Sequence, residues 1–154
     1  MKYYDYIRRF IEFMFSFILL IFAVPICVLA CITIYVELHV SPIYTQNRVG
    51  LNGKVFKIYK LRSMYIDAEK DGPKWASKND ERITKVGRII RKTRIDELPQ
   101  LFNILKGDMS IIGPRPERPE LIKEFIKYIP DFNDRLLVKP GITGWAQVNG
   151  GYSL

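Results

Sequence analysis

Two adjacent carboxylates, Asp96 and Glu97, are the side chains in this sequence best suited to chemistry. They precede a helical pattern that begins near Pro99, so the positive end of the helix dipole favours their ionised forms. An ionised aspartate can act as a nucleophile toward phosphorus. A neighbouring glutamate suits Mg²⁺, which binds one or two carboxylates together with phosphate oxygens. The alternative is routine capping of a helix start, for which an Asp-Glu pair is equally suitable.

Basic residues near this pair favour the chemical interpretation. Phosphoryl transfer needs cations arranged around a diphosphate, and the planar fork of arginine matches phosphate oxygens. Arg115 lies between two prolines in the run IIGPRPE, and these prolines stiffen its loop. Any one of these cations is also compatible with a solvated basic face. The candidate phosphate-binding residues are Lys60, Arg62, Arg91, Arg94 and Arg115.

Composition narrows the range of partners. The 154 residues carry a net charge of +8, which is typical of proteins that bind nucleic acid, anionic lipid or a phosphate-bearing substrate. The sequence has no zinc-ligand spacing, no basic-leucine heptads and no aromatic RNA-binding strand, so we expect no nucleic-acid partner. His39 stands alone, and neither GxxxxGK[ST] nor GxGxxG occurs. The carboxylate pair is therefore the main candidate for catalysis.

An uncharged apolar run covers residues 13–36. At ~1.5 Å per residue it is long enough for a bilayer core of ~30 Å. Basic residues flank both of its ends, which conflicts with the positive-inside rule for a spanning helix. Pro25, in the middle, removes a backbone donor and marks the predicted membrane break. We predict a re-entrant segment, helix-break-helix, over residues 1–40. A spanning helix kinked at Pro25 and a signal peptide are the alternatives.

The remaining residues, 41–154, are expected to form one small domain. Residues 43–62 alternate as a β-hairpin around a Gly-rich turn. Helical patterns follow at 84–93, at 98–105 and at 119–129, where the last helix packs on the core or on a membrane surface. Residues 67–80 form a polar, mobile loop. Both cysteines lie in the apolar run, so this domain has no disulfide, which is consistent with a reducing cytoplasm.

Four stretches resemble the bacterial sugar transferases, the monotopic polyprenol-phosphate phosphoglycosyl transferases. They are YTQNRVG, FKIYKLRSM, TRIDELPQLFNILKGDMSIIGPRPE and VKPGITGWAQVNG, and they cover most of the chain from Tyr44 to Gly150. The resemblance implies an α+β, mainly helical protein: a re-entrant membrane segment followed by a small cytoplasmic catalytic domain with a short hairpin. It places this domain on the cytoplasmic side of the bacterial inner membrane.

The same resemblance implies a reaction. The family transfers a sugar-1-phosphate from a UDP-sugar to undecaprenyl phosphate, the first membrane step of exopolysaccharide, capsule or glycoconjugate synthesis. By analogy, Asp96 is the nucleophile that forms an aspartyl sugar-phosphate, and Glu97 assists it and shares an Mg²⁺ site with it. Lys60, Arg91 and Arg115 match basic positions near the family's phosphates. The implied partners are the UDP-sugar, undecaprenyl phosphate and membrane lipid, with a homo-oligomer as a further expectation.

Two departures from the family pattern qualify these expectations. Many members carry serine before the breaking proline, where this chain has Val24. Members also continue beyond the last motif, whereas this sequence ends at Leu154, so it is expected to lack a C-terminal part. The alternative function is accordingly a truncated, catalytically inactive membrane-bound remnant or partner of such an enzyme.

Overall fold

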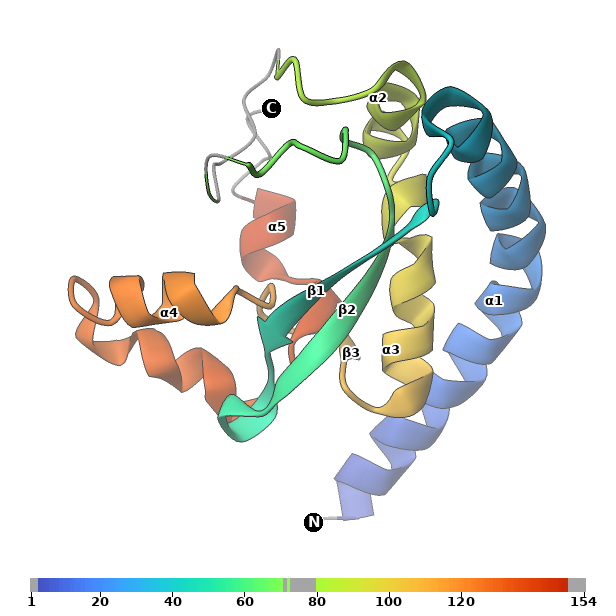
Figure 1. Cartoon of the computed structure of the whole chain (residues 1–154). Helices are drawn as coiled ribbons and strands as arrows, with labels where there is room; N and C mark the ends of the chain where they lie inside the picture. Colours follow the sequence, from blue (N-terminus) through green and yellow to red (C-terminus); the bar gives the residue numbers. More distant parts are fainter. Residues whose placement is uncertain (1–2, 71, 73–79, 150–154) are drawn as a thin grey trace.

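A computed structural model describes residues 3–70, 72 and 80–149 (Figure 1). One long helix, α1 (Tyr3–Leu38), runs along the outside of a body of shorter helices and two two-stranded sheets. This arrangement confirms the mainly helical α+β class with a long apolar N-terminal helix. Most of the loop predicted at 67–80 lies outside the described residues.

The β-hairpin is confirmed. β1 (Ile43–Val49) pairs antiparallel with β2 (Val55–Leu61), with Ile43 opposite Leu61. The connecting turn η1 (Leu51–Gly53) contains two residues with positive φ, Asn52 and Gly53, which are residue types that tolerate the left-handed region. Phe56 and Ile58 alternate along β2 into the core, and Lys60, two positions after Ile58, lies on the same face of the strand, where its side chain meets Glu97.

Three short helices follow on one side of the hairpin. α2 (Lys85–Lys92) starts at Thr84, whose hydroxyl accepts a hydrogen bond from the backbone N–H of Gly87. The pattern predicted as one helix at 98–105 is split into a 3-10 turn, η2 (Ile95–Gln100), and α3 (Leu101–Lys106). α3 ends at Gly107, which adopts φ 87°, a left-handed conformation that favours glycine at the end of a helix.

The C-terminal part contains a parallel strand pair that the sequence did not predict. β3 (Ser110–Ile112) pairs with β4 (Gly141–Thr143), so strands about 30 residues apart lie side by side. Between them come α4 (Pro119–Phe125) and the 3-10 helix η3 (Pro130–Leu137), and α5 (Trp145–Asn149) follows. α4 is shorter than the predicted 119–129: it ends at Phe125, residues 126–128 form a turn, and Ile129, which precedes Pro130, is extended.

The predicted break at Pro25 is wrong: α1 is one continuous 36-residue helix with Pro25 inside it. Proline removes one hydrogen bond and bends a helix without necessarily ending it. Figure 1 shows α1 as a curved helix that follows α3 and α2. Its buried side chains form one stripe, namely Glu12, Ser16, Ala23, Ala30 and Ile34.

The N-terminal helix shares its core with the rest of the chain. Ala23 packs with Phe56 and Ile104, and Ile34 packs with Leu61 and Ile90. The small side chains of the stripe allow close approach, while most other apolar side chains of α1 remain exposed. Within the described residues, α1 is the one helix whose length and composition would allow it to cross a membrane.

Both ends of α1 are hydrogen-bonded to the same body. Near the start, Arg8 Nη2 donates to Ser110 Oγ at 2.7 Å and Arg9 Nη2 donates to the Leu105 carbonyl at 2.7 Å. Near the end, the carboxylate of Glu37 accepts from the backbone N–H of Lys85 at 2.8 Å, at the start of α2. α1 is therefore attached to the domain at both ends as well as through its middle.

Candidate active site

The carboxylate pair lies in the first turn of η2, directly after a sharp change of chain direction. Arg94, which directly precedes η2, has φ 61° and ψ 13°, a left-handed conformation that few residues other than glycine and asparagine adopt. This turn separates α2 from η2 and directs Asp96 into the protein against β2. The predicted position at a helix start is confirmed, although the helix is a 3-10 turn.

Asp96 is buried, with a relative exposure of 9%. Among the described residues, no hydrogen-bond donor reaches its buried Oδ1 atom. Burial raises the pKa of Asp96 to about 6, and the negative charge of Glu97 adds to this shift, while Lys60, Arg91 and Arg94 oppose it. A carboxylate without a bound donor keeps its lone pairs for a ligand, which is what a nucleophile requires.

Glu97 is held between two cations. Its Oε1 lies 3.3 Å from Lys60 Nζ and 3.4 Å from Arg115 Nη1. Burial acts to raise the pKa of Glu97, but Lys60 and Arg115 outweigh it, so the pKa lies below its usual value. Burial also lowers the pKa of Lys60, against the influence of Glu97. Glu97 therefore loses its proton at a lower pH than Asp96 does, and its carboxylate holds both cations beside Asp96.

The predicted basic residues divide into two groups. Lys60 and Arg115 contact Glu97, and Arg91 and Arg94 lie close enough to Asp96 to stabilise its charge. Arg62 is engaged elsewhere, because its Nε donates to the Ser41 carbonyl at 2.9 Å and its guanidinium lies over the Tyr44 ring. The structure therefore brings four of the five predicted cations to the carboxylates.

Three residues that the sequence did not single out hold the loop that carries Arg115. Arg135 Nη2 donates to the Arg115 carbonyl at 2.5 Å, and Arg48 Nη1 donates to the Pro116 carbonyl at 3.0 Å. Glu117 pairs with both arginines, at 3.6 Å from Arg48 and 4.0 Å from Arg135. Arg48 and Glu117 lie within the motifs quoted above, but charge alone does not reveal partners so distant along the chain.

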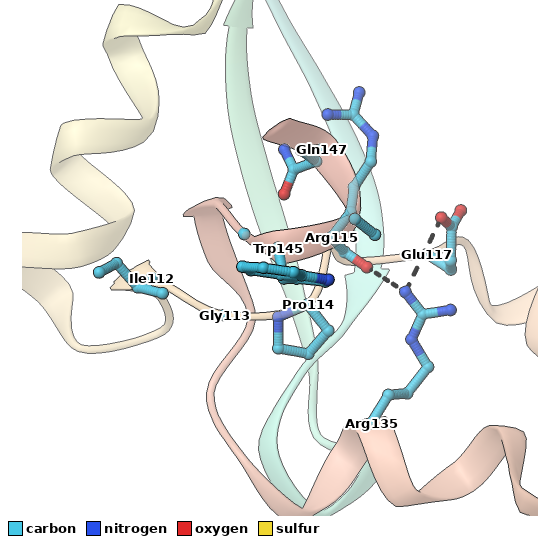
Figure 2. A pocket seen from close by; sticks show the side chains of 10 residues that line it. Ile112, Gly113, Pro114, Arg115, Glu117, Arg135, Trp145 and Gln147 are labelled. Carbon is cyan, nitrogen blue, oxygen red and sulfur yellow. Dashed lines mark hydrogen bonds and ion pairs between the residues drawn. The ribbon is translucent and has the colours of Figure 1, made fainter. Parts of the chain in front are cut away.

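A pocket of about 640 Å³ lies between this loop and α5 (Figure 2). Figure 2 shows the Trp145 ring near Pro114, with the Gln147 amide oxygen directed toward the same space. The loop packs tightly against the chain before β4: a Cβ atom on Gly113 would lie 2.3 Å from the Lys139 carbonyl oxygen. The lining residues are Ile112, Gly113, Pro114, Arg115, Glu117, Arg135, Gly144, Trp145, Ala146 and Gln147.

The carboxylate pair fits Mg²⁺ as a cation shared with a substrate. Among the described residues, no group of three or more His, Cys, Asp or Glu side chains is placed to hold a metal ion. Mg²⁺ usually takes only one or two carboxylates and completes its coordination with water and phosphate oxygens. The unpartnered Oδ1 of Asp96, beside ionised Glu97, matches that smaller ligand set.

Comparison with known proteins identifies the family of this chain. The model of the family described as bacterial sugar transferase matches residues 3–154. A Bacillus subtilis protein, provisionally named an undecaprenyl-phosphate N-acetylgalactosaminyl 1-phosphate transferase, is 56% identical over 130 residues, covering 84% of this chain and 73% of the relative.

Two longer relatives show the same similarity. The UDP-N-acetylgalactosamine-undecaprenyl-phosphate N-acetylgalactosaminephosphotransferase of Aeromonas hydrophila is 44% identical, covering 97% of this chain and 36% of that protein. The UDP-glucose:undecaprenyl-phosphate glucose-1-phosphate transferase of Escherichia coli K12 is 46% identical, covering 80% of this chain and 27% of that protein. The chain thus spans about a third of these two relatives. The family match over nearly the whole sequence shows that the chain belongs to the bacterial sugar transferases.

Proposed function

We propose that this chain transfers a sugar-1-phosphate from a UDP-sugar to undecaprenyl phosphate. The observation that carries the proposal is a buried, unpartnered Asp96 oxygen beside an ionised glutamate and a group of cations. The names of the relatives support it, because they describe sugar-1-phosphate transfer to this lipid. The product would be the first lipid-linked intermediate of an exopolysaccharide, capsule or glycoconjugate.

The chemistry consists of two displacements at one phosphorus atom. An oxygen of Asp96 attacks the phosphorus that carries the sugar, the bond from this phosphorus to the bridging oxygen breaks, and UMP leaves with the electron pair. A phosphate oxygen of undecaprenyl phosphate then attacks the same phosphorus and releases the Asp96 carboxylate. Each step joins two anions, so the charges of Lys60, Arg91, Arg94 and Arg115 must offset their repulsion.

Glu97 keeps two of these cations in place. Through its contacts it holds Lys60 and Arg115 on the side of Asp96 that a diphosphate must reach. Glu97 and Asp96 are also the residues that would hold Mg²⁺, which when bound supplies positive charge to the diphosphate. The contacts of Arg48, Glu117 and Arg135 hold the loop that carries Arg115, and so they direct Arg115 toward Glu97.

The test is release of UMP from a panel of UDP-sugars, with Mg²⁺ and undecaprenyl phosphate in detergent. We expect release with at least one sugar. We also expect kcat/KM to fall about tenfold per pH unit below a pH of about 6, because Asp96 must be ionised to attack and its pKa is raised to about 6. A rate that is independent of pH between 5 and 8 would contradict this assignment. No release with any sugar would favour the non-catalytic alternative.

We further propose that both ends of α1 lie at one face of the membrane, with the helix embedded along that face and the catalytic domain on the cytoplasmic side of the inner membrane. A 36-residue helix is ~54 Å long, well over the ~30 Å of a bilayer core. Arg8 and Arg9 at one end and Glu37 at the other contact the same domain. A helix crossing the bilayer would hold its two ends on opposite sides, which these contacts do not favour.

Cysteine labelling tests this topology. Single cysteines at Asp5 and Thr45, in a protein whose Cys27 and Cys31 are replaced by alanine, mark the two flanks of α1. We expect an impermeant maleimide to label both positions in inverted inner-membrane vesicles and neither in intact spheroplasts. Permeabilised spheroplasts, in which both must react, provide the control. Labelling of the two positions from opposite sides would show a spanning helix.

A further inference from the structure

We propose that the pocket between the Pro114–Pro116 loop and α5 binds the base and ribose of the nucleoside diphosphate sugar, and that Trp145 stacks on the base. This inference rests on the proposed function, because it assigns the nucleotide half of that substrate. The carboxylates act on the phosphate that carries the sugar, so the nucleoside must occupy a neighbouring site.

Arg115 connects the two sites. Its guanidinium lies 3.4 Å from Glu97 Oε1, and the residue also lines the pocket. In a nucleoside diphosphate sugar, the base and ribose are separated from the reacting phosphorus by one further phosphate. With the sugar-bearing phosphate at Asp96, the second phosphate lies near Arg115 and the nucleoside extends into the pocket. A volume of about 640 Å³ falls within the range of small-molecule sites.

Trp145 supplies a stacking surface. Its side chain is 82% exposed, which is unusual for tryptophan, a residue that is highly buried on average. It stands on the pocket wall close to the loop (Figure 2). Stacking of a base on an aromatic ring is tolerant of sequence and contributes substantially to the binding of nucleotides. A planar base would cover the indole face and remove apolar surface from water.

Gln147 is a second, independent indication of a ligand. Its Nε2 donates to the Ile142 carbonyl at 3.1 Å, which fixes the orientation of the amide. Its buried Oε1 has no hydrogen-bond donor among the described residues. Gly144 is closely packed beside this atom, since a Cβ there would lie 2.3 Å from the Gly113 carbonyl oxygen and 3.3 Å from Oε1. The imide N–H of a base such as uracil is a donor that would satisfy this oxygen.

The competing occupant is the isoprenoid chain of the acceptor lipid, since most of the pocket wall is apolar. Two features favour the nucleoside. The pocket contains charged side chains, Arg115, Glu117 and Arg135, and an amide with an unused acceptor. A hydrocarbon chain would cover these charged side chains without hydrogen-bonding to them and would leave the Gln147 acceptor unused, whereas ribose hydroxyls and a base edge can hydrogen-bond to such groups.

The fluorescence of Trp145 provides a direct test. The sequence contains two tryptophans, so a Trp75→Phe background leaves Trp145 as the single emitter. This protein is titrated in detergent with UMP, with inorganic pyrophosphate and with a short-chain polyprenyl phosphate. We expect saturable quenching by UMP and no quenching by the other two ligands, because only UMP carries a base that stacks on the indole.

Calorimetry on variants measures the contribution of the ring. We expect Trp145→Ala to raise the Kd for UMP about 5- to 100-fold, as loss of one base stack implies. Trp145→Phe should restore most of the affinity. Val148→Ala, an exposed position on the same short helix outside the pocket lining, is the matched control and should leave Kd unchanged. Thermal unfolding checks that each variant is folded.

Quenching by polyprenyl phosphate instead of UMP would overturn the proposal and assign the pocket to the acceptor. An unchanged Kd for UMP in folded Trp145→Ala would also overturn it.

Asp96→Asn separates this inference from the proposed function, because it removes the nucleophile and leaves the pocket intact. If UMP quenches Trp145 but the protein with Asp96 intact turns over no UDP-sugar, the base site is supported and the proposed reaction is contradicted. If turnover occurs without quenching, the reaction stands and the base binds elsewhere.

Discussion

Asp96→Asn is expected to abolish UMP release, with a loss of roughly a thousandfold or more, because the amide keeps the shape of the side chain and lacks the nucleophilic charge. The sugar-phosphate adduct should disappear at the same time. Intact-protein mass after mixing with UDP-sugar and Mg²⁺ in detergent, without acceptor lipid, measures it directly. Nucleotide binding should survive, since the cations around Glu97 remain.

The control for this substitution is Asp67→Asn, an exposed aspartate whose side chain is 69% accessible. A longer relative with the same motif, and its own Asp-to-Asn variant, should be measured in parallel. An adduct of equal yield in both forms would place the nucleophile elsewhere. Turnover without any adduct in either protein would favour direct transfer from the UDP-sugar to the lipid phosphate.

The same substitution should stabilise the protein at neutral pH. Asp96 has a pKa of about 6 in the folded state and an ordinary value of 3.8, so folding binds a proton and stability falls as the pH rises from about 4 to 6. Removing the buried charge should therefore raise the free energy of unfolding by roughly 2–3 kcal/mol above pH 6, and by little below pH 4. Thermal unfolding at pH 7.5 and pH 4 measures this difference. A lower melting temperature at pH 7.5 would contradict the assigned burial cost.

Glu97→Gln is expected to have the second large effect on activity. Unlike Asp96→Asn, it should lower the stability of the protein. The neutral amide is a poor ligand for a hard cation and no longer neutralises Lys60 and Arg115. We expect kcat/KM to fall roughly a hundredfold and the Mg²⁺ concentration for half-maximal rate to rise. The protein should be destabilised by roughly 1–3 kcal/mol, because Lys60 is left buried without its counter-charge.

The measurements are Mg²⁺ titrations of initial rate and thermal unfolding at pH 7.5. Glu124→Gln, an exposed position on α4, provides the matched control for the loss of one negative charge. An unchanged Mg²⁺ response in Glu97→Gln would remove Glu97 from the metal site. A higher melting temperature in Glu97→Gln would show that the contacts of Glu97 with Lys60 and Arg115 do not stabilise the fold.

Features governed by neighbours along the chain were predictable from the sequence. The hairpin followed from alternating residues around a turn with Asn52 and Gly53, α2 from a short basic run, and α3 from the apolar spacing of Leu98 to Leu105. The family resemblance, carried by long continuous motifs, was confirmed by the family match over residues 3–154. These features depend on interactions within a few residues or on residue order, both of which a single sequence displays.

Tertiary packing decided the features that make a site. Asp96 and Glu97 are adjacent in sequence and of similar chemistry, yet burial raises the pKa of one while Lys60 and Arg115 lower that of the other. Packing of α1 against the domain keeps it helical through Pro25, where local rules predicted a break. The contacts that aim Arg115 join residues up to 68 positions apart, at Arg48 and Pro116. Side-chain burial and charge pairing at such separations are set by how the elements pack, which composition and periodicity do not specify.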